Sequence, residues 1–449
     1  MQKSRYGVAL LGWAAAIPCA VPSYAQHESH AADTAPHAMW STRIGERWQL
    51  TGMAQLFPIV TIGAPGVEQS PLRRTHGYLT QPALMLDFGD VRQRVVLRTT
   101  LNFEAFTLED GELTFGAWGE GFIDKRHPHT FLHELMVSVN LWSVGGGDVS
   151  LSAGKGFAPF GTDDPMSRPG LKYPTNHHLS QILERWTVNA VYLRSGWSVE
   201  AGLFGGTEPA GPHDLSNIES FGDSWSTRIA KRWGGGTGPM AAWELAASYG
   251  YVVEEHEELR EHTALWNAAL RHVGSMRTST VYAMIEASRS EPEHDDSYFS
   301  ILGEAGLAWR GHQPYGRIEY ATRPEYTRAG MTGDAFFRYD HDDEPIGATR
   351  WAIATLGYGY EATEYPVSVR PFAEAQLHRV GGKRGGISPR ALFERNRFWS
   401  VSFGARIFLG GDPMRMGAYG VLDPMTAMHR DMSMPMHDAG HVPMHDRER

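Results

Sequence analysis

The stretch FWSVSFGARIFL, residues Phe398–Leu409, has two unlike faces. One parity is apolar without interruption and contains Trp399, Val401, Phe403, Ala405, Ile407 and Leu409. The other parity is small, polar or charged, with aromatic residues near its ends, and contains Phe398, Ser400, Ser402, Gly404, Arg406 and Phe408. Alternation with a period of two indicates a β-strand with one apolar and one polar face.

The same alternation recurs along the chain. It predicts strands near 47–58, 77–88, 91–105, 130–143, 147–157, 183–194, 197–206, 223–233, 240–252, 261–272, 276–288, 297–310, 313–323, 347–361, 366–379 and 397–409. Short, Gly-rich turns alternate with long connections, as in outer-membrane barrels. We therefore predict an all-β transmembrane antiparallel β-barrel of about 16 strands, with 14 or 18 left open. A soluble β-sandwich or propeller is the alternative. The sequence contains no repeat of the length of a propeller blade, which argues against the propeller.

The N-terminus has the features of a secretory signal. Lys3 and Arg5 precede a short apolar run, and Ser23–Ala25 forms a small-residue cleavage site, which predicts a signal peptide over 1–25. A short His-containing periplasmic arm is expected over 26–45 and the barrel over 46–410. Cys19 lies in the signal, so the mature chain has no thiolate ligand and no disulfide. The net charge of −10 argues against a nucleic-acid partner.

Charged residues recur on the parity opposite the apolar one, which predicts that they line the lumen. The expected selectivity residues on the strands are Arg94, Arg98, Glu104, Glu134, Arg185, Arg370, Glu374 and Arg406. Glu200, Arg228, Arg232, Glu244, Arg271 and Glu286 share this parity. Sixteen strands leave room for an aqueous channel. The charges either filter solutes or only brace the wall through cross-strand ion pairs.

The connection over 158–182 is among the longest. Phe157, Pro159 and Phe160 supply apolar anchors, so we expect this loop to fold against the inner wall and narrow the pore. Four charged residues would then line the constriction: Asp163, Asp164, Arg168 and Lys172.

The signal, the alternating strands, the aromatic strand ends and the early long loop together resemble Gram-negative outer-membrane porins over about 40–410. The run GKGFAPFGTDDP, from Gly154 to Pro165, is similar to the strand-to-loop segment of substrate-selective porin-like families. The resemblance implies a channel for small polar or charged solutes in outer-membrane lipid, and it leaves a homotrimer open.

The segment 411–449 combines methionine and histidine in a polar, proline-broken context. Its expected metal ligands are Met428, His429, Met432, Met434, Met436, His437, His441, Met444 and His445. Thioethers select Cu(I), and imidazole binds copper in both oxidation states. The segment resembles the Met/His-rich parts of bacterial copper-resistance proteins, which implies a flexible periplasmic tail that binds copper ions. The alternative is a tail of biased composition without a metal.

A second histidine group could converge at the outer mouth and bind copper, zinc or nickel: His127, His129, His133, His177 and His178, with Glu134. Scattered surface histidines are the competing interpretation.

We expect no enzyme, because the chain lacks GxSxG, P-loop and dinucleotide-binding motifs. Two alternatives to a channel remain open. One is a plugged barrel for copper sequestration and resistance. The other is a rim hydrolase using Asp340 and His341 or His294 and Asp295.

Overall fold

The structure is a computed structural model. It describes residues 40–63, 75–107, 130–162, 179–182, 184–209, 212–215, 218, 220–234, 242–256, 259–276, 279–294, 297–326, 328–329, 338–339, 345–364, 366–384 and 395–410. All of them belong to one compact unit, His37–Arg449.

The described chain is almost entirely β-strand. The N-terminal half contains β1 (Trp40–Ile44), β2 (Trp48–Ile62), β3 (Thr75–Asp90), β4 (Val95–Asn102), α1 (Glu104–Thr107), β5 (Leu132–Val144), β6 (Gly147–Gly156), β7 (Arg185–Arg194), β8 (Trp197–Phe204) and β9 (Ser224–Trp233). The C-terminal half contains β10 (Ala242–His256), β11 (Leu259–Met276), β12 (Ser279–Pro292), β13 (Tyr298–Trp309), β14 (His312–Tyr326), β15 (Arg328–Ala329), β16 (Arg338–Tyr339), β17 (Pro345–Tyr360), β18 (Ala362–Glu364), β19 (Val367–Arg384) and β20 (Arg397–Leu409).

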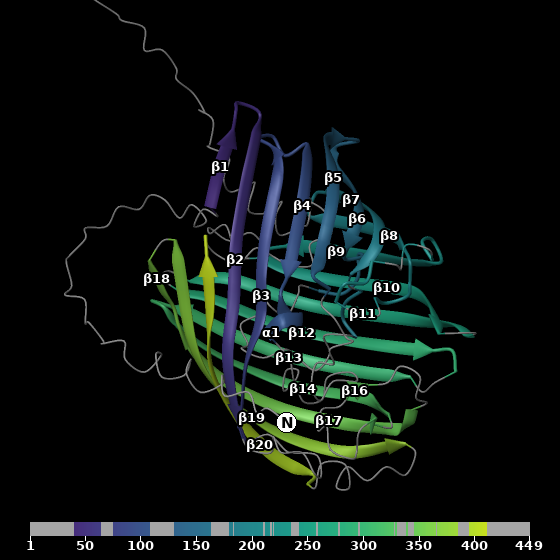
Figure 1. Cartoon of the computed structure of the whole chain (residues 1–449), viewed down its shortest axis with the longest axis vertical. Coiled ribbons are helices and arrows are strands. Elements are labelled where there is room, and N and C mark those ends of the chain that lie inside the picture. Colours follow the sequence, from purple (N-terminus) through teal and green to yellow (C-terminus); the bar gives the residue numbers. More distant parts are fainter. Residues whose placement is uncertain are drawn as a thin grey trace, which may run out of the picture. The chain divides into compact units, whose positions relative to one another are not determined.

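The sheet closes on itself. Neighbouring strands pair antiparallel in chain order from β2 to β14, then through β17, β19 and β20, and β20 pairs back with β2 from Ala54↔Leu409 to Ile62↔Val401. The short strands β1 and β18 extend this ring, which leaves sixteen barrel strands in the 18-stranded sheet. Each predicted strand overlaps one of these sixteen, so the predicted fold class is confirmed (Figure 1).

Strand β1 fills the part of the β2 edge that β20 does not reach. It pairs with β2 from Trp40↔Gly52 to Ile44↔Trp48, while β20 ends opposite Ala54. The Trp40 N–H donates to the Gly410 carbonyl at 2.6 Å, so β1 continues the line of β20. All five β1 side chains are exposed, so β1 contributes mainly main-chain pairing, to which Ser41 adds a hydrogen bond from Gln49 Nε2 at 2.7 Å.

The short connections have the turn chemistry that their length requires. Ser195 and Gly196 join β7 to β8, and their φ angles of +50° and +75° are those of a two-residue hairpin turn with both central residues left-handed. β2 begins next to the β3–β4 turn, because Trp48 pairs with Asp90, the last residue of β3. β20 ends next to the short turn before β19, because the Gly410 N–H donates to the Pro366 carbonyl at 2.8 Å.

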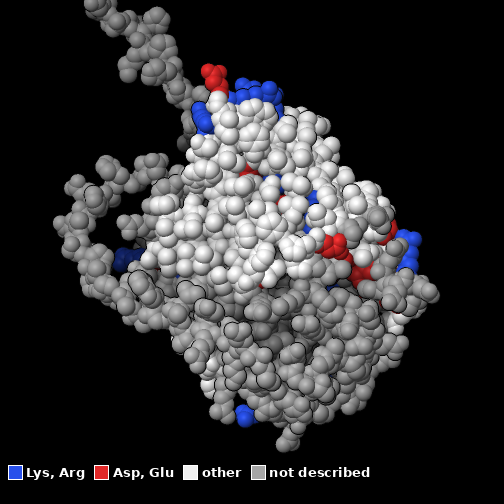
Figure 2. Space-filling model, viewed as in Figure 1, with Lys and Arg blue, Asp and Glu red and all other residues white. Residues whose placement is uncertain are grey.

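The two faces of the barrel differ as the alternation predicts. On β20 the outward Trp399 and Phe403 are 59% and 50% exposed, whereas the inward Phe398 and Phe408 are 6% and 0% exposed. Figure 2 shows a broad uncharged face over the described strands. Closure of the ring pairs the main-chain N–H and C=O groups at the strand edges, and the apolar outer surface is compatible with lipid contact. The chain is thus a transmembrane β-barrel, an architecture that belongs to the bacterial outer membrane.

Among the described residues, no helix is long and apolar enough to span a membrane.

Candidate functional site: the inner wall and its loop

The inner wall of the barrel is polar. Serine, threonine, asparagine, glutamate and arginine occupy the inward positions of most strands, and they are buried. Burial of so many charges requires ion pairs and hydrogen bonds. The arrangement of those partners defines the site.

Two segments of the loop between β6 and β7 lie against this wall, and we call residues 157–162 and 179–182 the inner loop segments. They contact each other, because the Ala158 N–H donates to the Ile182 carbonyl at 3.1 Å. Gly161 makes the tightest contact between them: its φ is +68°, and an added Cβ would lie 1.7 Å from the Ser180 carbonyl oxygen. Only glycine fits this position without displacing the chain.

Apolar side chains anchor the inner loop segments on widely separated strands. Ala158, Phe160 and Ile182 pack with Phe204 of β8 and Val252 of β10. At the other end, Leu179 packs with Tyr298 of β13 and Ala348 of β17. The inner loop segments therefore contact the wall from β8 to β17, and the predicted inward folding of this loop is observed for its described residues.

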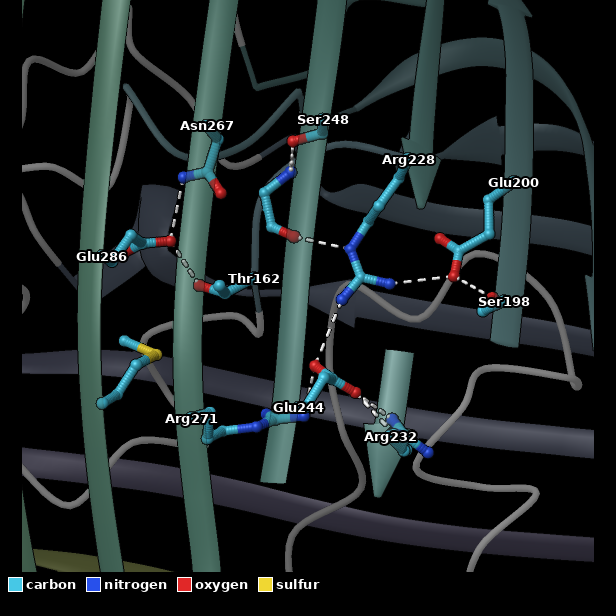
Figure 3. A network of polar contacts seen from close by, with 12 residues as sticks. Thr162, Ser198, Glu200, Arg228, Arg232, Glu244, Ser248, Asn267, Arg271 and Glu286 are labelled. Carbon is cyan, nitrogen blue, oxygen red and sulfur yellow. Dashed lines mark hydrogen bonds and ion pairs between the residues drawn. The ribbon is translucent and has the colours of Figure 1, made fainter. Parts of the chain in front are cut away.

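Five charged residues on neighbouring strands form a connected set that we call the Arg228 network, and Arg228 joins this set to the loop main chain. Its members are Glu200, Arg228, Arg232, Glu244 and Arg271 (Figure 3). Arg228 on β9 donates from Nε to the Gly161 carbonyl at 2.8 Å, and its Nη1 lies 2.8 Å from Glu200 Oε1. Glu244 on β10 accepts from three guanidinium groups: Arg228 at 3.3 Å, Arg271 at 2.9 Å and Arg232 at 2.5 Å.

Two further contacts attach Gly161 and Thr162 to the wall. The Gly161 N–H donates to Ser248 Oγ at 2.9 Å, so both main-chain groups of this glycine are bound by the wall. Thr162 Oγ1 donates to Glu286 Oε1 at 2.6 Å, and Asn267 Nδ2 donates to the same oxygen at 3.0 Å. Each of these partners comes from a different strand, β10, β11 or β12 (Figure 3).

A buried cluster joins the start of β5 to the start of β7. Glu184, just before β7, accepts from the Thr130 N–H at 2.9 Å and contacts His133 Nδ1 at 2.5 Å. Lys155 Nζ donates to Thr130 Oγ1 and to the Leu132 carbonyl. His133 is the extra residue of a β-bulge, since Thr100 pairs with Glu134 and Leu101 with Leu132, and this explains why two consecutive residues are both buried.

The remaining predicted wall residues are mostly paired locally. Arg98 forms two hydrogen bonds of 2.9 Å with Asp87, and Glu134 accepts from Thr100 at 2.6 Å. Arg185 lies 2.8 Å from Glu208, and Arg370 lies 3.0 Å from Glu361. Glu374 accepts from the Tyr315 hydroxyl at 2.5 Å, and Arg406 lies over the Phe57 and Phe372 rings.

Two placements differ from the prediction. Arg94 is exposed in the β3–β4 turn rather than on the lumen wall, because Asp90 Oδ1 accepts from the Arg94 and Val95 N–H groups and lengthens the turn. Glu104 lies after β4, because this strand ends at Asn102 and not at residue 105 as predicted. Asn102 Oδ1 accepts from the Glu104 N–H at 2.8 Å and so starts α1. The Glu104 carboxylate is buried and accepts from Thr80 and the Gln81 N–H.

Several predicted residues lie outside the described ranges. In the loop they are Asp163, Asp164, Arg168 and Lys172, and in 411–449 they are all the predicted metal ligands. Of the second histidine group they are His127, His129, His177 and His178, and of the rim pairs they are Asp295, Asp340 and His341. Within the residues that are described, no group of three or more metal-ligating side chains is placed to hold an ion.

The Arg228 network was not among the predicted selectivity residues. Its members share the inward parity, which is the only sequence signal that marks them. Their convergence on Gly161 depends on strand register, which the sequence does not display.

No family model matches the chain, and no curated protein matches it. Solved structures similar to it include an anion-selective porin from Comamonas acidovorans, 10% identical, with a TM-score of 0.46 over 82% of this chain and 100% of that chain. Another is OprB from Pseudomonas putida, 10% identical, with a TM-score of 0.47 over 81% of this chain and 94% of that chain. A third is OmpT, an outer membrane protein of Vibrio cholerae, 11% identical, with a TM-score of 0.43 over 80% of this chain and 97% of that chain.

Proposed function

We propose that this barrel is a porin-like outer-membrane channel for small polar or charged solutes, narrowed by the inner loop segments. The observation that carries the proposal is the polar, charge-paired inner wall to which the loop main chain is bound at Gly161. A barrel wall with fixed charges favours hydrated solutes over apolar ones. A loop held at both main-chain groups of one residue gives the narrowing a defined position.

The ion pairs between wall charges limit how much these charges contribute to solute selectivity. Arg228 and Glu244 are compensated within the Arg228 network, so these charges act mainly on the loop position. Selectivity is then set by the loop charges Asp163, Asp164, Arg168 and Lys172, as predicted from the sequence. No catalytic role is proposed.

Planar-bilayer recording of the refolded mature chain tests the channel. We expect stepwise conductance in potassium chloride and a reversal potential, in a salt gradient, that shifts when Asp163→Asn and Asp164→Asn are combined. Each of Asp163→Asn and Asp164→Asn is also recorded singly, and the matched single-charge control is Asp148→Asn at the start of β6, where Asp148 accepts from the Ser143 N–H. The control should leave the reversal potential unchanged. Absence of any conductance in correctly folded protein would exclude the channel and favour the plugged barrel.

A copper-binding role of segment 411–449 is a second proposal, supported only by the ligand chemistry of its methionines and histidines. Such a tail would hold copper next to the end of the barrel at which β20 terminates. Its test is given in the Discussion.

A further inference from the structure

The outer surface of three adjacent strands changes from apolar residues to arginine at one level. On β19 the outward residues Val367, Val369, Pro371, Ala373, Ala375 and Leu377 are followed by Arg379. On β20 the outward run from Leu409 back to Trp399 is followed by Arg397, and on β17 the run from Tyr360 back to Ala352 is followed by Arg350. All three arginines are exposed. We call Arg350, Arg379 and Arg397 the outer arginine row.

The height of the row matches the edge of the hydrocarbon layer. Val367 to Leu377 spans about 34 Å along the strand at about 3.4 Å per residue. A strand tilt of about 45° reduces this to about 24 Å along the membrane normal, close to the ~25 Å apolar band of such barrels. The row lies at the end of the strands that carries the long connections 327–344 and 385–396, which is the external end.

Strand register brings the arginines together. Arg379 pairs directly with Arg397, and Ala352 pairs with Arg379, which places Arg350 one outward position further along β17. Directly opposite residues have Cβ atoms about 5 Å apart, and like charges in such a pair are destabilising. Arg379 and Arg397 make no ion pair with any residue in the described ranges, and Arg350 donates only from Nε to the Gly382 carbonyl at 2.9 Å.

Another outward arginine at this end of the barrel has a carboxylate partner. Arg289 on β12 is 53% exposed on its side chain, and its Nη2 lies 2.6 Å from Glu291 on the same strand. The outer arginine row has no such carboxylate among the described residues. Within the described chain its three guanidinium groups are therefore accessible to an anionic ligand.

We propose that the outer arginine row binds the phosphorylated headgroup of an outer-leaflet lipid. Guanidinium groups bind phosphate through paired N–H donors, and arginines at the membrane surface attract anionic lipid headgroups. Leu377 and Trp399, which lie directly below the row, present exposed apolar surface to the acyl chains of the same lipid. A lipid satisfies both surfaces at once, whereas a free phosphate satisfies only the arginines.

Native mass spectrometry of the full chain in neutral detergent tests this proposal. The three probes are bisphosphorylated lipid A, lipid A without phosphates, and inorganic phosphate. We expect the wild-type protein to retain bisphosphorylated lipid A and neither other probe. The combined variant Arg350→Gln, Arg379→Gln and Arg397→Gln should bind it about a hundredfold more weakly, from about fivefold for each arginine. The corresponding triple lysine variant should retain much of the affinity.

The matched control removes three exposed arginines at the opposite end of the barrel: Arg47→Gln, Arg194→Gln and Arg310→Gln. It changes the net charge equally and should bind like the wild type. Equal binding by the outer-row variant and the control, or equal binding of lipid A with and without phosphates, would overturn the proposal. Tight binding of inorganic phosphate alone would also overturn the lipid assignment. If the triple glutamine variant does not fold, Arg379→Gln and Arg397→Gln are tested singly for the fivefold loss.

Discussion

Arg228 Nε lies 2.8 Å from the main-chain oxygen of Gly161, so a side chain of the barrel wall fixes the backbone of the inward-folded loop. Arg228 and Glu200 are almost fully buried, with side-chain exposures of 2% and 0%. The loop position therefore depends on a charged residue that could be removed without altering the loop sequence.

Replacing Arg228 with methionine should destabilise the barrel and release the loop. The change leaves the buried Glu200 without its guanidinium partner, and breaking a buried ion pair in this way costs about 3 to 5 kcal/mol. Guanidinium-induced unfolding in lipid vesicles measures the stability, and bilayer recording should show larger, noisier currents. Arg289→Met, which breaks the exposed pair with Glu291, is the control and should cost less than about 1 kcal/mol. Equal effects of the two substitutions would contradict this role of Arg228.

Gly161→Ala should separate the inner loop segments. The residue has a φ of +68°, and its new methyl group would lie 1.7 Å from the Ser180 oxygen, so the main chain must move. We expect higher conductance and faster trypsin cleavage between β6 and β7. Gly303→Ala is the matched control, because its Cβ meets no atom within 4 Å. Unchanged currents and cleavage in folded Gly161→Ala would show that these segments do not narrow the pore.

Deleting Trp40–Ile44 should weaken the barrel at its short-turn end. The deletion leaves the edge of β2 from Trp48 to Gly52 without its partner, and each lost main-chain hydrogen bond is worth about 1 kcal/mol. We expect a loss of a few kcal/mol in the same unfolding assay. Substituting alanine at residues 41–43 should cost much less, because the β1 side chains are exposed and the main chain is retained. If the alanine variant were as unstable as the deletion, side-chain contacts rather than pairing would hold β1.

Removing segment 411–449 should abolish tight Cu(I) binding. Thioether and imidazole ligands are concentrated there, and the whole chain contains a single cysteine, Cys19. Competition with a Cu(I) chelator measures binding to full-length protein and to protein ending at Gly410. A full-length variant with serine at Met428, Met432, Met434, Met436 and Met444 should bind Cu(I) more weakly but bind Cu(II) unchanged through its histidines. Equal Cu(I) affinity of the two chain lengths would refute the copper-binding tail.

The sequence was sufficient to predict the barrel because lipid and a polar interior impose opposite chemistry on alternate residues. In β20 this separates Trp399 from Phe398 correctly, although both are aromatic. The alternation failed where side chains redirect the main chain. Asp90 lengthens a turn and removes Arg94 from the wall, Asn102 ends β4 before Glu104, and the bulge at His133 changes the facing of one residue.

The candidate site was predictable only in part. The anchors Phe157 and Phe160 mark a loop that folds inward, since two large apolar side chains close together are costly to leave in a solvated loop. The partners of Gly161 come from β9 and β10, far away in sequence, and nothing in their local sequence distinguishes them from other inward residues. Register across several strands decides which inward charges meet.

The hydrogen bond between Trp40 and Gly410 places the first and last residues of the barrel segment next to each other, so the order of the strands is circular. The ring of strands would keep every pairing if a short linker joined these two residues and the chain were opened at another hairpin, such as Ser195–Gly196. The same strand pairing is therefore possible wherever the barrel segment begins and ends, and circular permutants of this barrel should form the same sheet. What the natural order does determine is timing, since the first barrel strand must wait for the last before the ring can close.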